Sequence, residues 1–418
     1  MNKSDSLQAR VGRLLAGDPE ELSRPYETWN ELRETKPLLR MDGMVVLSRH
    51  ADVKTMLGDN HVLYSRADTR YTKRYEQARS TFGQQGQEAF DRVLDYEFRQ
   101  IVRMDPPDHP RVRKVVTPPF AVRHLAREME SVVELRVKEV LDDMASAGRR
   151  VDFKKVAYTL PLNVLGDLLG IPLKDLDEVH GWAFKIAENK NNSDSAAAAI
   201  DADEAYLGLI AYIERLVAAQ LVSGNTTGLV SALLAAVETA AITRDEMVAM
   251  LALMIFAGHE TTSNLLSIGL YELLRHRDQW ELLCADPSLT EPAVEELLRF
   301  VTPAHFAQVS AIQPQELYGE RIEPGDVVVG IMAAANRDPE VFERPDELDL
   351  RREDSRYHVA LGMGPHFCLG AGLARMEATA LMRQLVERFP KLELTDEPLT
   401  WGGRALRTPA SMPVLIGS

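Results

Sequence analysis

Cysteine is scarce in this chain of 418 residues, which contains only Cys284 and Cys368. Two thiols cannot build the disulfide framework that holds small secreted proteins together, so we expect a reducing, cytoplasmic environment. Cys284 ends a mostly apolar run that begins at Trp280, and this run predicts a buried helix face. Cys368 is instead surrounded by glycines, which makes it the cysteine with a candidate function.

Basic charge and a long apolar leader are also lacking. Lys and Arg number 48 against 63 Asp and Glu, a net charge of −15, which argues against a nucleic-acid surface. The segment 1–17 has no apolar run long enough for a signal peptide or a membrane anchor. We therefore expect a protein that binds neither nucleic acid nor a membrane by its own sequence.

Helical periodicity dominates the chain, and the strand signals are short. Turn residues and alternating apolar positions predict a small β-rich part near 37–60 and 305–330, including a hairpin with an Asp42-Gly43 turn. Most of the remainder has the apolar spacing of amphipathic helices. The polar stretch 65–103 is weakly periodic, so we interpret it as a lid or binding loop with one helix near 88–102. The predicted fold class is mainly α with small β-sheets.

The longest helical signal, 243–274, is interrupted in its middle. Residues 247–256 are all apolar, so this helix is expected to run through the interior. Glycine, acid and hydroxyl side chains then follow within 257–262, where each costs stability. A threonine hydroxyl bonded back to a helix carbonyl would explain Thr261. It would leave Glu260 unexplained, and we favour a proton-delivery site made of Glu260 and Thr261.

The segment 361–370 places Cys368 among three glycines and a proline, directly before a helix. Glycines free the backbone for tight turns and let a flat ligand approach closely. Backbone N–H groups at a helix start favour a thiolate, which is a ligand for soft or redox metals. By these local residues alone, a structural cysteine and a metal ligand are equally good interpretations.

Two charged pairs share helix faces. His109 and Arg113 are four residues apart after Pro106-Pro107 and suit a carboxylate partner, although a solvated basic face explains them more simply. Glu296 and Arg299 are three apart, a spacing that is common on surfaces.

Taken together and in order, these segments resemble the cytochrome P-450 family, of the soluble bacterial kind. The family's cysteine loop is filled by Gly364, His366, Cys368 and Gly370, and its Glu-x-x-Arg motif by Glu296 and Arg299. The acid-threonine motif matches at 257–262, the Asp-Pro-Pro-x-His-x-x-x-Arg segment at 105–113, and the Asn-Arg-Asp-Pro meander at 336–339. The resemblance extends from the hairpin near Leu38 to the end of the chain.

The resemblance implies one domain, 1–418, with haem b between the long helix and the cysteine loop. It implies that Cys368 is the axial thiolate ligand of iron and that Glu260 and Thr261 feed protons to dioxygen, the co-substrate. It assigns haem contacts, most of them to the propionates, to four side chains and a glycine: His109, Arg113, His358, His366 and Gly370. Glu296 and Arg299 would be a structural pair that, with Arg352, fixes the cysteine loop.

Two positions depart from the family's pattern. Leu361 replaces a phenylalanine that commonly shields the thiolate, so the shielding of the thiolate and the reduction potential of the iron are in question. Val309 stands where many bacterial members have an arginine that meets a propionate, so neutralisation should rest more heavily on the histidines and Arg113.

The predicted activity is that of a haem-thiolate monooxygenase that hydroxylates or epoxidises an apolar organic substrate, for instance a polyketide or other secondary metabolite. Leu253, Phe256 and Ala257 are expected beside that substrate. Electrons would come from NAD(P)H through a separate ferredoxin reductase and ferredoxin, with Arg111, Lys114 and Arg375 as a candidate basic dock.

Three alternatives stay open at this point. A P-450 that couples carbon atoms or uses peroxide would keep Cys368 and could dispense with the proton relay. A non-catalytic haem-binding sensor would bind haem without turnover. A cysteine hydrolase would need a histidine base oriented by an acid, and no acid is placed to orient His366.

Overall fold

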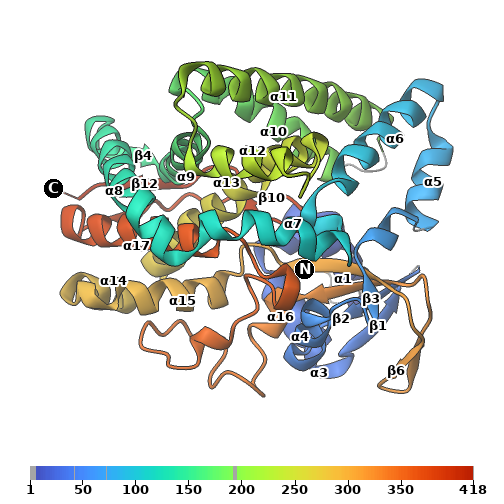
Figure 1. Cartoon of the computed structure of the whole chain (residues 1–418). Coiled ribbons are helices and arrows are strands. Elements are labelled where there is room, and N and C mark those ends of the chain that lie inside the picture. Colours follow the sequence, from blue (N-terminus) through green and yellow to red (C-terminus); the bar gives the residue numbers. More distant parts are fainter. Residues whose placement is uncertain (1–5, 42, 72, 192–194, 418) are drawn as a thin grey trace.

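The computed structural model describes residues 6–41, 43–71, 73–191 and 195–417. Helices form most of the molecule, and the strands form small sheets at separate places in it (Figure 1). The helices are α1 (Leu7–Ala16), α2 (Pro19–Ser23), α3 (Pro25–Thr35), α4 (His50–Gly58), α5 (Lys73–Thr81), α6 (Gln84–Phe98), α7 (Asp108–Val116), α8 (Val122–Ser146), α9 (Phe153–Leu169), α10 (Leu176–Asn191), α11 (Ala196–Ser223), α12 (Gly228–Glu238), α13 (Arg244–Arg275), α14 (Arg277–Ala285), α15 (Thr290–Val301), α16 (Met332–Ala335) and α17 (Ala371–Arg388). The strands are β1 (Leu38–Met41), β2 (Met44–Leu47), β3 (Tyr64–Ser65), β4 (Arg150–Asp152), β5 (Phe306–Ala311), β6 (Gln315–Leu317), β7 (Glu320–Ile322), β8 (Val327–Ile331), β9 (Glu393–Leu394), β10 (Trp401–Gly402), β11 (Thr408–Pro409) and β12 (Pro413–Leu415).

The two segments predicted to be β-rich form one sheet. Its order is β1-β2-β8-β5-β3, with β2 and β8 parallel and the other neighbours antiparallel. Asp42, half of the predicted turn between β1 and β2, lies outside the described residues, whereas Gly43 has the positive φ of 78° that such a turn favours. The remaining strands pair as β4-β12-β9, β10-β11 and β6-β7. The predicted fold class, mainly α with small sheets, is confirmed.

Several helices were not predicted. α1 begins after Ser6, whose hydroxyl accepts the Ala9 N–H at 3.2 Å, and it buries Val11, Leu14 and Leu15 on one face. The stretch 65–103 was interpreted as mostly irregular, yet it contains α5 as well as α6. Cys284 was expected on a buried face and is only partly buried, because Trp280 and Leu283 occupy the buried positions of α14.

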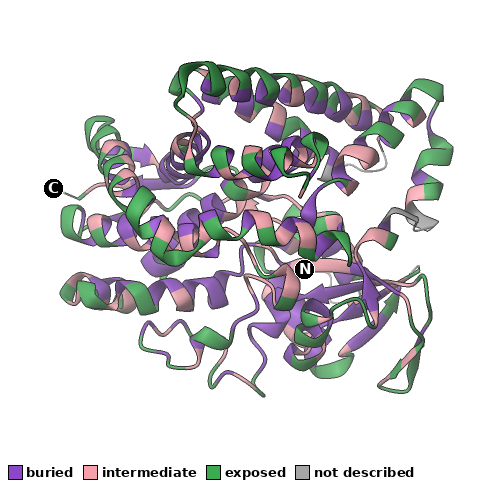
Figure 2. Cartoon of the chain, in the orientation of Figure 1, coloured by how far each residue is buried: buried purple, intermediate pink, exposed green. Residues whose placement is uncertain are grey.

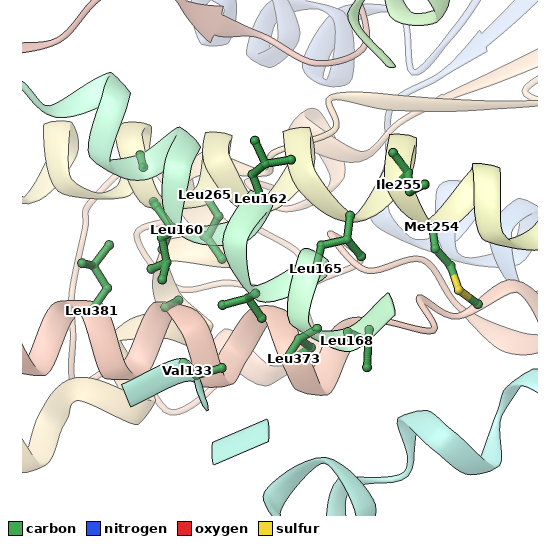
Figure 3. Packing of buried hydrophobic residues seen from close by; sticks show 14 of the residues in the cluster. Val133, Leu160, Leu162, Leu165, Leu168, Met254, Ile255, Leu265, Leu373 and Leu381 are labelled. Atoms are coloured by element: carbon green, nitrogen blue, oxygen red, sulfur yellow. The ribbon is translucent and has the colours of Figure 1, made fainter. Parts of the chain in front are cut away.

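The centre of the molecule is α13. Its first turn carries a capping box: Thr243 Oγ1 accepts the Glu246 N–H at 3.1 Å, and Glu246 accepts the Thr243 N–H at 2.7 Å. Aliphatic side chains from α9 and α17 pack with those of α13 in the largest hydrophobic cluster (Figure 3). Figure 2 shows that the outer helices expose their solvent side while the interior helices are mostly buried. The core thus holds α13 in place around its polar interruption.

Among the described helices, α11 alone is long and apolar enough to cross a membrane by length and composition. In the structure it packs against α6, α10 and α13. A partly buried helix of a folded core passes the same test, so this feature is weak support for a membrane span.

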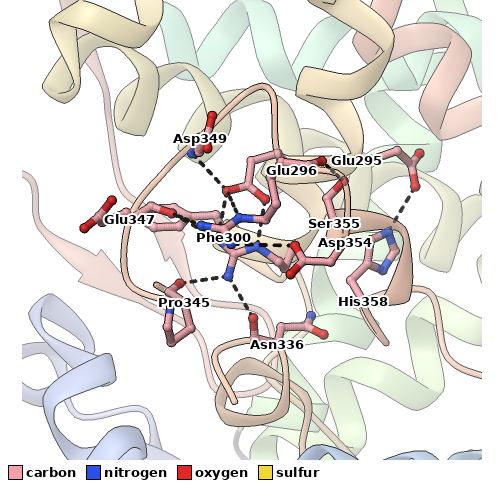
Figure 4. Close-up of polar contacts among 12 residues, drawn as sticks. Glu295, Glu296, Phe300, Asn336, Pro345, Glu347, Asp349, Asp354, Ser355 and His358 are labelled. Atoms are coloured by element: carbon pink, nitrogen blue, oxygen red, sulfur yellow. Dashed lines mark hydrogen bonds and ion pairs between the residues drawn. The ribbon is translucent and has the colours of Figure 1, made fainter. Parts of the chain in front are cut away.

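A fully buried ion pair fixes the segment that leads to the cysteine loop (Figure 4). Arg299 Nε and Nη2 bind the two carboxylate oxygens of Glu296 at 2.7 Å each, and both side chains have no exposed surface. Arg299 also donates to three backbone carbonyls, those of Asn336, Pro345 and Glu347. Arg352 Nε reaches Glu296 at 3.1 Å, so the expected contact of the pair with Arg352 is present. The pair therefore holds several turns of irregular backbone in one arrangement.

Replacing Arg299 with leucine is expected to lower the free energy of unfolding by about 3–5 kcal/mol, because Glu296 keeps a buried charge with one partner fewer. Arg344→Leu is the matched control. Arg344 pairs with Glu347 at the surface, where both side chains are more than half exposed, and its loss should cost less than about 1 kcal/mol. Urea denaturation of both variants measures the difference. Equal losses would contradict a structural role for the buried pair.

Candidate active site

The cysteine loop is a compact turn before α17. The Cys368 N–H donates to the Leu361 carbonyl at 2.8 Å, which closes the loop on itself. Gly364 has φ +61°, and a Cβ there would lie 2.9 Å from the backbone of Gly58 at the end of α4. Glycine is therefore required at position 364 both for its conformation and for its close approach to α4.

Opposing effects act on the pKa of the Cys368 thiol. Burial raises this pKa above its ordinary value, while the backbone N–H of Gly370 and the charges of Arg113 and Arg375 lower it. The sequence-based expectation that the helix start favours a thiolate is therefore outweighed by burial. A bound metal cation deprotonates a coordinating thiol outright, so the loop presents a thiol suited to metal ligation.

The middle of α13 keeps solvent-accessible surface although the helix runs through the core. Phe256, Ala257, Glu260 and Thr261 are only partly buried, between long buried stretches of the same helix. Leu361 and Leu369 of the cysteine loop and Phe256 and Ala257 of α13 pack against the same hydrophobic cluster. The loop and the interrupted helix thus border one interior region.

The simpler explanation of Thr261 is present in the structure. Its Oγ1 donates to the Ala257 carbonyl at 3.0 Å, and Thr262 repeats the pattern toward Gly258 at 3.2 Å. Glu260 has a further neighbour that sequence analysis missed, Lys154 of α9. Burial lowers the pKa of Lys154 to about 8, and the charge of Glu260 acts in the opposite direction. No spacing in the sequence links positions 154 and 260.

Basic side chains converge on a narrow cavity beside the cysteine loop. Arg66, His109, Val309 and His366 line it together with Asp105. The His109 and His366 rings lie 4.1 Å apart between centroids, and the buried Nε2 of His109 has no hydrogen-bond partner in the described part of the chain. Burial, then Arg113 and Arg66, lower the pKa of His109. The cavity is thus a place for an anionic group.

His61 also lines this cavity, with its Nδ1 3.5 Å from Asp105 Oδ2. Both Arg66 and His61 were missed from the sequence, because they lie in or next to a stretch interpreted as a lid. Arg113, which was predicted, donates from Nη2 to the Phe367 carbonyl at 2.8 Å. It therefore contacts the residue before Cys368.

Two basic residues named in the sequence predictions lie beside the same acid. His358, predicted at the haem, has its Nε2 3.3 Å from Glu295, and Arg375, predicted in the basic dock, has its Nε 2.5 Å from it (Figure 4 shows the first contact). His358 does not line the basic cavity, and its contact with a haem propionate stays a prediction. Because Arg375 is paired with Glu295, its charge is less available to the predicted basic dock.

The other members of that dock differ in their availability. Arg111 forms ion pairs with Glu246 at 2.5 Å and Asp108 at 2.8 Å. Lys114 is exposed on the same helix, α7.

A second cavity, of about 190 Å³, lies where α6, α11 and α13 meet. Val248, Ala249 and Ala252 of α13 contribute to its apolar lining. Leu253 is buried in the main core, and none of Leu253, Phe256 and Ala257 is part of this lining, so their contact with the substrate stays a prediction. Phe256 and Ala257 lie farther along α13, toward Thr261.

Comparison with known proteins agrees with this geometry. A family model described as Cytochrome P450 matches residues 196–283 and 284–408. The cytochrome P450 monooxygenase PikC of Streptomyces venezuelae is 32% identical over 390 residues, which cover 90% of this chain and 87% of the relative. The 20-oxo-5-O-mycaminosyltylactone 23-monooxygenase of Streptomyces fradiae is 34% identical over 301 residues, 72% of this chain and 69% of that protein. The solved structure of the Bacillus subtilis bacillaene polyketide synthase cytochrome P450 PksS has a TM-score of 0.81 at 28% identity, covering 97% of this chain and 99% of that one.

The chain belongs to the cytochrome P450 family. It is therefore an oxidoreductase, a haem-dependent monooxygenase with dioxygen as co-substrate, and the family predicted from the sequence is confirmed. The residues present fit the cofactor. Cys368 offers a thiol for iron, and the cavity offers the unpartnered Nε2 of His109 and the guanidinium of Arg66 for the carboxylates of the porphyrin.

Glu295 provides a test of these contacts by pH. Its ion pairs with His358 and Arg375 lower its pKa to about 2 despite burial, against 4.5 when unfolded. A lowered carboxyl pKa stabilises the fold above pH 4.5, and this stabilisation, on the order of 3 kcal/mol, is lost as the pH falls toward 2. Glu295→Gln should therefore lose less stability than the parent between pH 5 and 3 in thermal unfolding. The control Glu340→Gln, with a side chain 63% exposed, should follow the parent. A parallel decline of parent and Glu295→Gln would contradict the assignment.

Proposed function

We propose that this P450 hydroxylates or epoxidises a large secondary metabolite of the polyketide type, with an apolar carbon skeleton that carries polar substituents. The observation that carries this proposal is the composition of the cavity of about 190 Å³ beside α13. Its size suits part of a large molecule, and most ligand pockets combine apolar walls with a few polar groups that fix orientation.

The cavity has an apolar side and a polar side. Val248, Ala249 and Ala252 of α13 and Leu207 and Ile210 of α11 supply the apolar lining. The polar lining comes from Tyr96, Arg99, Gln100, Tyr206, Glu214 and Asp245. Arg99 Nη1 binds Asp245 at 2.9 Å, so the polar side carries paired rather than isolated charge. Such a surface supports binding of hydroxyl or sugar substituents more than binding of a bare hydrocarbon.

The names of two similar proteins support the same class of substrate. One acts on a mycaminosyltylactone, and one is described as a polyketide synthase cytochrome P450. Both names indicate products of polyketide chemistry.

The haem, when bound, supplies activation of dioxygen and transfer of one oxygen atom to the substrate. We assign Cys368 Sγ to hold the iron and Thr261 Oγ1 with Glu260 to hold and pass protons on the opposite side. Phe256 and Ala257, with Leu253 behind them, would exclude water and position the carbon skeleton. We further propose that the chain acts as one domain in the cytoplasm. Electrons would come from NAD(P)H through a ferredoxin reductase and a ferredoxin that docks near Lys114.

The proton-relay role of Thr261 is tested with a pair of isosteric variants. Thr261→Val should lower product formation by roughly 10²-fold and raise the hydrogen peroxide released per dioxygen consumed, because the hydroxyl that delivers protons is gone. Thr262→Val removes the neighbouring hydroxyl, which is 5% exposed and makes the same kind of helix contact. It should change peroxide release little. Equal effects of the two variants would count against a relay at Thr261 and favour a peroxide-using or coupling enzyme.

Substrate class is tested by ligand-induced spin-state shifts of the ferric protein. In a panel of macrolactones, steroids and fatty acids, the macrolactones should bind, and Ala252→Phe should weaken their binding about tenfold or more by overfilling the cavity. Imidazole, a small ligand of the iron, is the control and should bind both proteins alike. Macrolactone binding that is absent, or unchanged in Ala252→Phe, would overturn the proposal.

A further inference from the structure

The basic cavity lacks a cation where the family's pattern places one. Val309 of β5 is 1% exposed and lines the cavity beside His109 and His366. Its isopropyl group cannot neutralise a carboxylate. The porphyrin carries two carboxylates, so the missing charge has to come from another residue.

The residue that directly follows the neighbouring strand β3 carries a guanidinium. β3 pairs antiparallel with β5, and its register sets Tyr64 opposite Ala311 and Ser65 opposite Ser310. One residue further along the same register, Arg66 comes opposite Val309. Side chains at directly opposed positions of an antiparallel pair have Cβ atoms about 4.5–5.5 Å apart, so the two share one local environment. Both line the same cavity.

The surroundings of Arg66 favour an anionic partner. Across the described part of the chain, the guanidinium of Arg66 makes no hydrogen bond or ion pair within contact distance. The nearby acid, Asp105, is already engaged: it accepts from Ser65 Oγ at 2.5 Å and from the backbone N–H groups of Arg66 and Ala67 at 3.0 and 3.1 Å. The charge of Arg66 is thus not matched by a direct side-chain contact.

Neighbouring cations add to this imbalance. Burial and then the charge of Arg103 lower the pKa of Arg66 to about 10, which still leaves it charged at neutral pH. Burial and then the charge of Arg66 lower the pKa of His366, so this imidazole is neutral and can contribute a hydrogen bond but no charge. Cationic groups of this kind cluster in a protein interior when an anion joins them.

We propose that Arg66 binds a haem carboxylate in place of the arginine that is absent at position 309. The positive charge is carried by the residue after β3 and not by β5, and it lines the same cavity as Val309. Arg66 is therefore a cofactor-binding residue of this chain, acting beside His109 and His366. The inference rests on the cofactor and is independent of the proposed substrate.

The test compares Arg66→Leu with Arg66→Leu/Val309→Arg, in which the guanidinium returns to β5. Transfer of haem from the ferric holoenzyme to excess apomyoglobin is followed by absorbance, and the midpoint potential is measured by spectroelectrochemistry. Arg66→Leu should release haem about 10- to 100-fold faster, since a charge-assisted hydrogen bond is lost. Its potential should fall, because removing a cation favours the ferric form. The double variant should recover both properties.

Arg40→Leu serves as the matched control. Arg40 lies on β1 of the same sheet and pairs with Asp326 at 3.1 Å, away from the cavity lining. If Arg66→Leu has the same haem release rate and the same midpoint potential as this control, the proposal is overturned. If Arg66→Leu retains no haem, the double variant decides: recovered haem supports the proposal, and loss of haem there, with Val309→Arg alone still loaded, rejects it.

Discussion

A guanidinium ion inside a protein must find an acceptor for each of its five N–H donors, and Arg299 does so. Two acceptors belong to Glu296, and three are carbonyls of the segment 336–347. Asn336, one of the residues held in this way, accepts the Val359 N–H at 2.7 Å, two residues before the carbonyl that receives the Cys368 N–H. Hydrogen bonds, together with the short backbone from Val359 to Leu361, therefore connect a buried ion pair to Cys368. The position of the thiol depends on a charge that never contacts the cofactor.

The two sides of the site rely on different kinds of support. The cysteine loop is held by polar contacts to irregular backbone, whereas α13 is held by aliphatic packing along both of its buried ends. The buried side chains on both sides of the polar interruption hold α13 in the core. Glu260 and Thr261 can therefore remain partly accessible to solvent within a core helix. The whole molecule is acidic, with a net charge of −15, yet the cavity beside the loop gathers histidines and arginine. Local geometry, not the overall charge, sets the electrostatics that the cofactor meets.

Sequence reasoning succeeded where residues interact within one element and failed where distant elements meet. The Glu296–Arg299 contact follows from a spacing of three residues, which a helix turns into neighbours. Glu295 captures both His358 and Arg375, which lie 63 and 80 positions away, and no periodic pattern encodes that choice. The placement of Arg66 in the same cavity as Val309 depends on β3, a strand of two residues that is too short to be recognised from alternation. The fold class was thus predictable, while part of the basic set that lines the cavity beside the cysteine loop was not.

The short strand β3 has a consequence for how the cofactor and the rest of the chain influence each other. β3 leads directly into the segment that carries α5 and α6, and α6 lines the cavity assigned to the substrate. A residue at the end of β3 that contacts haem would tether the entrance of the substrate cavity to the porphyrin edge. Loading of the cofactor would then restrict the conformations of the entrance before any substrate arrives. Substrate affinity and cofactor retention in this enzyme would then both depend on the two-residue strand β3.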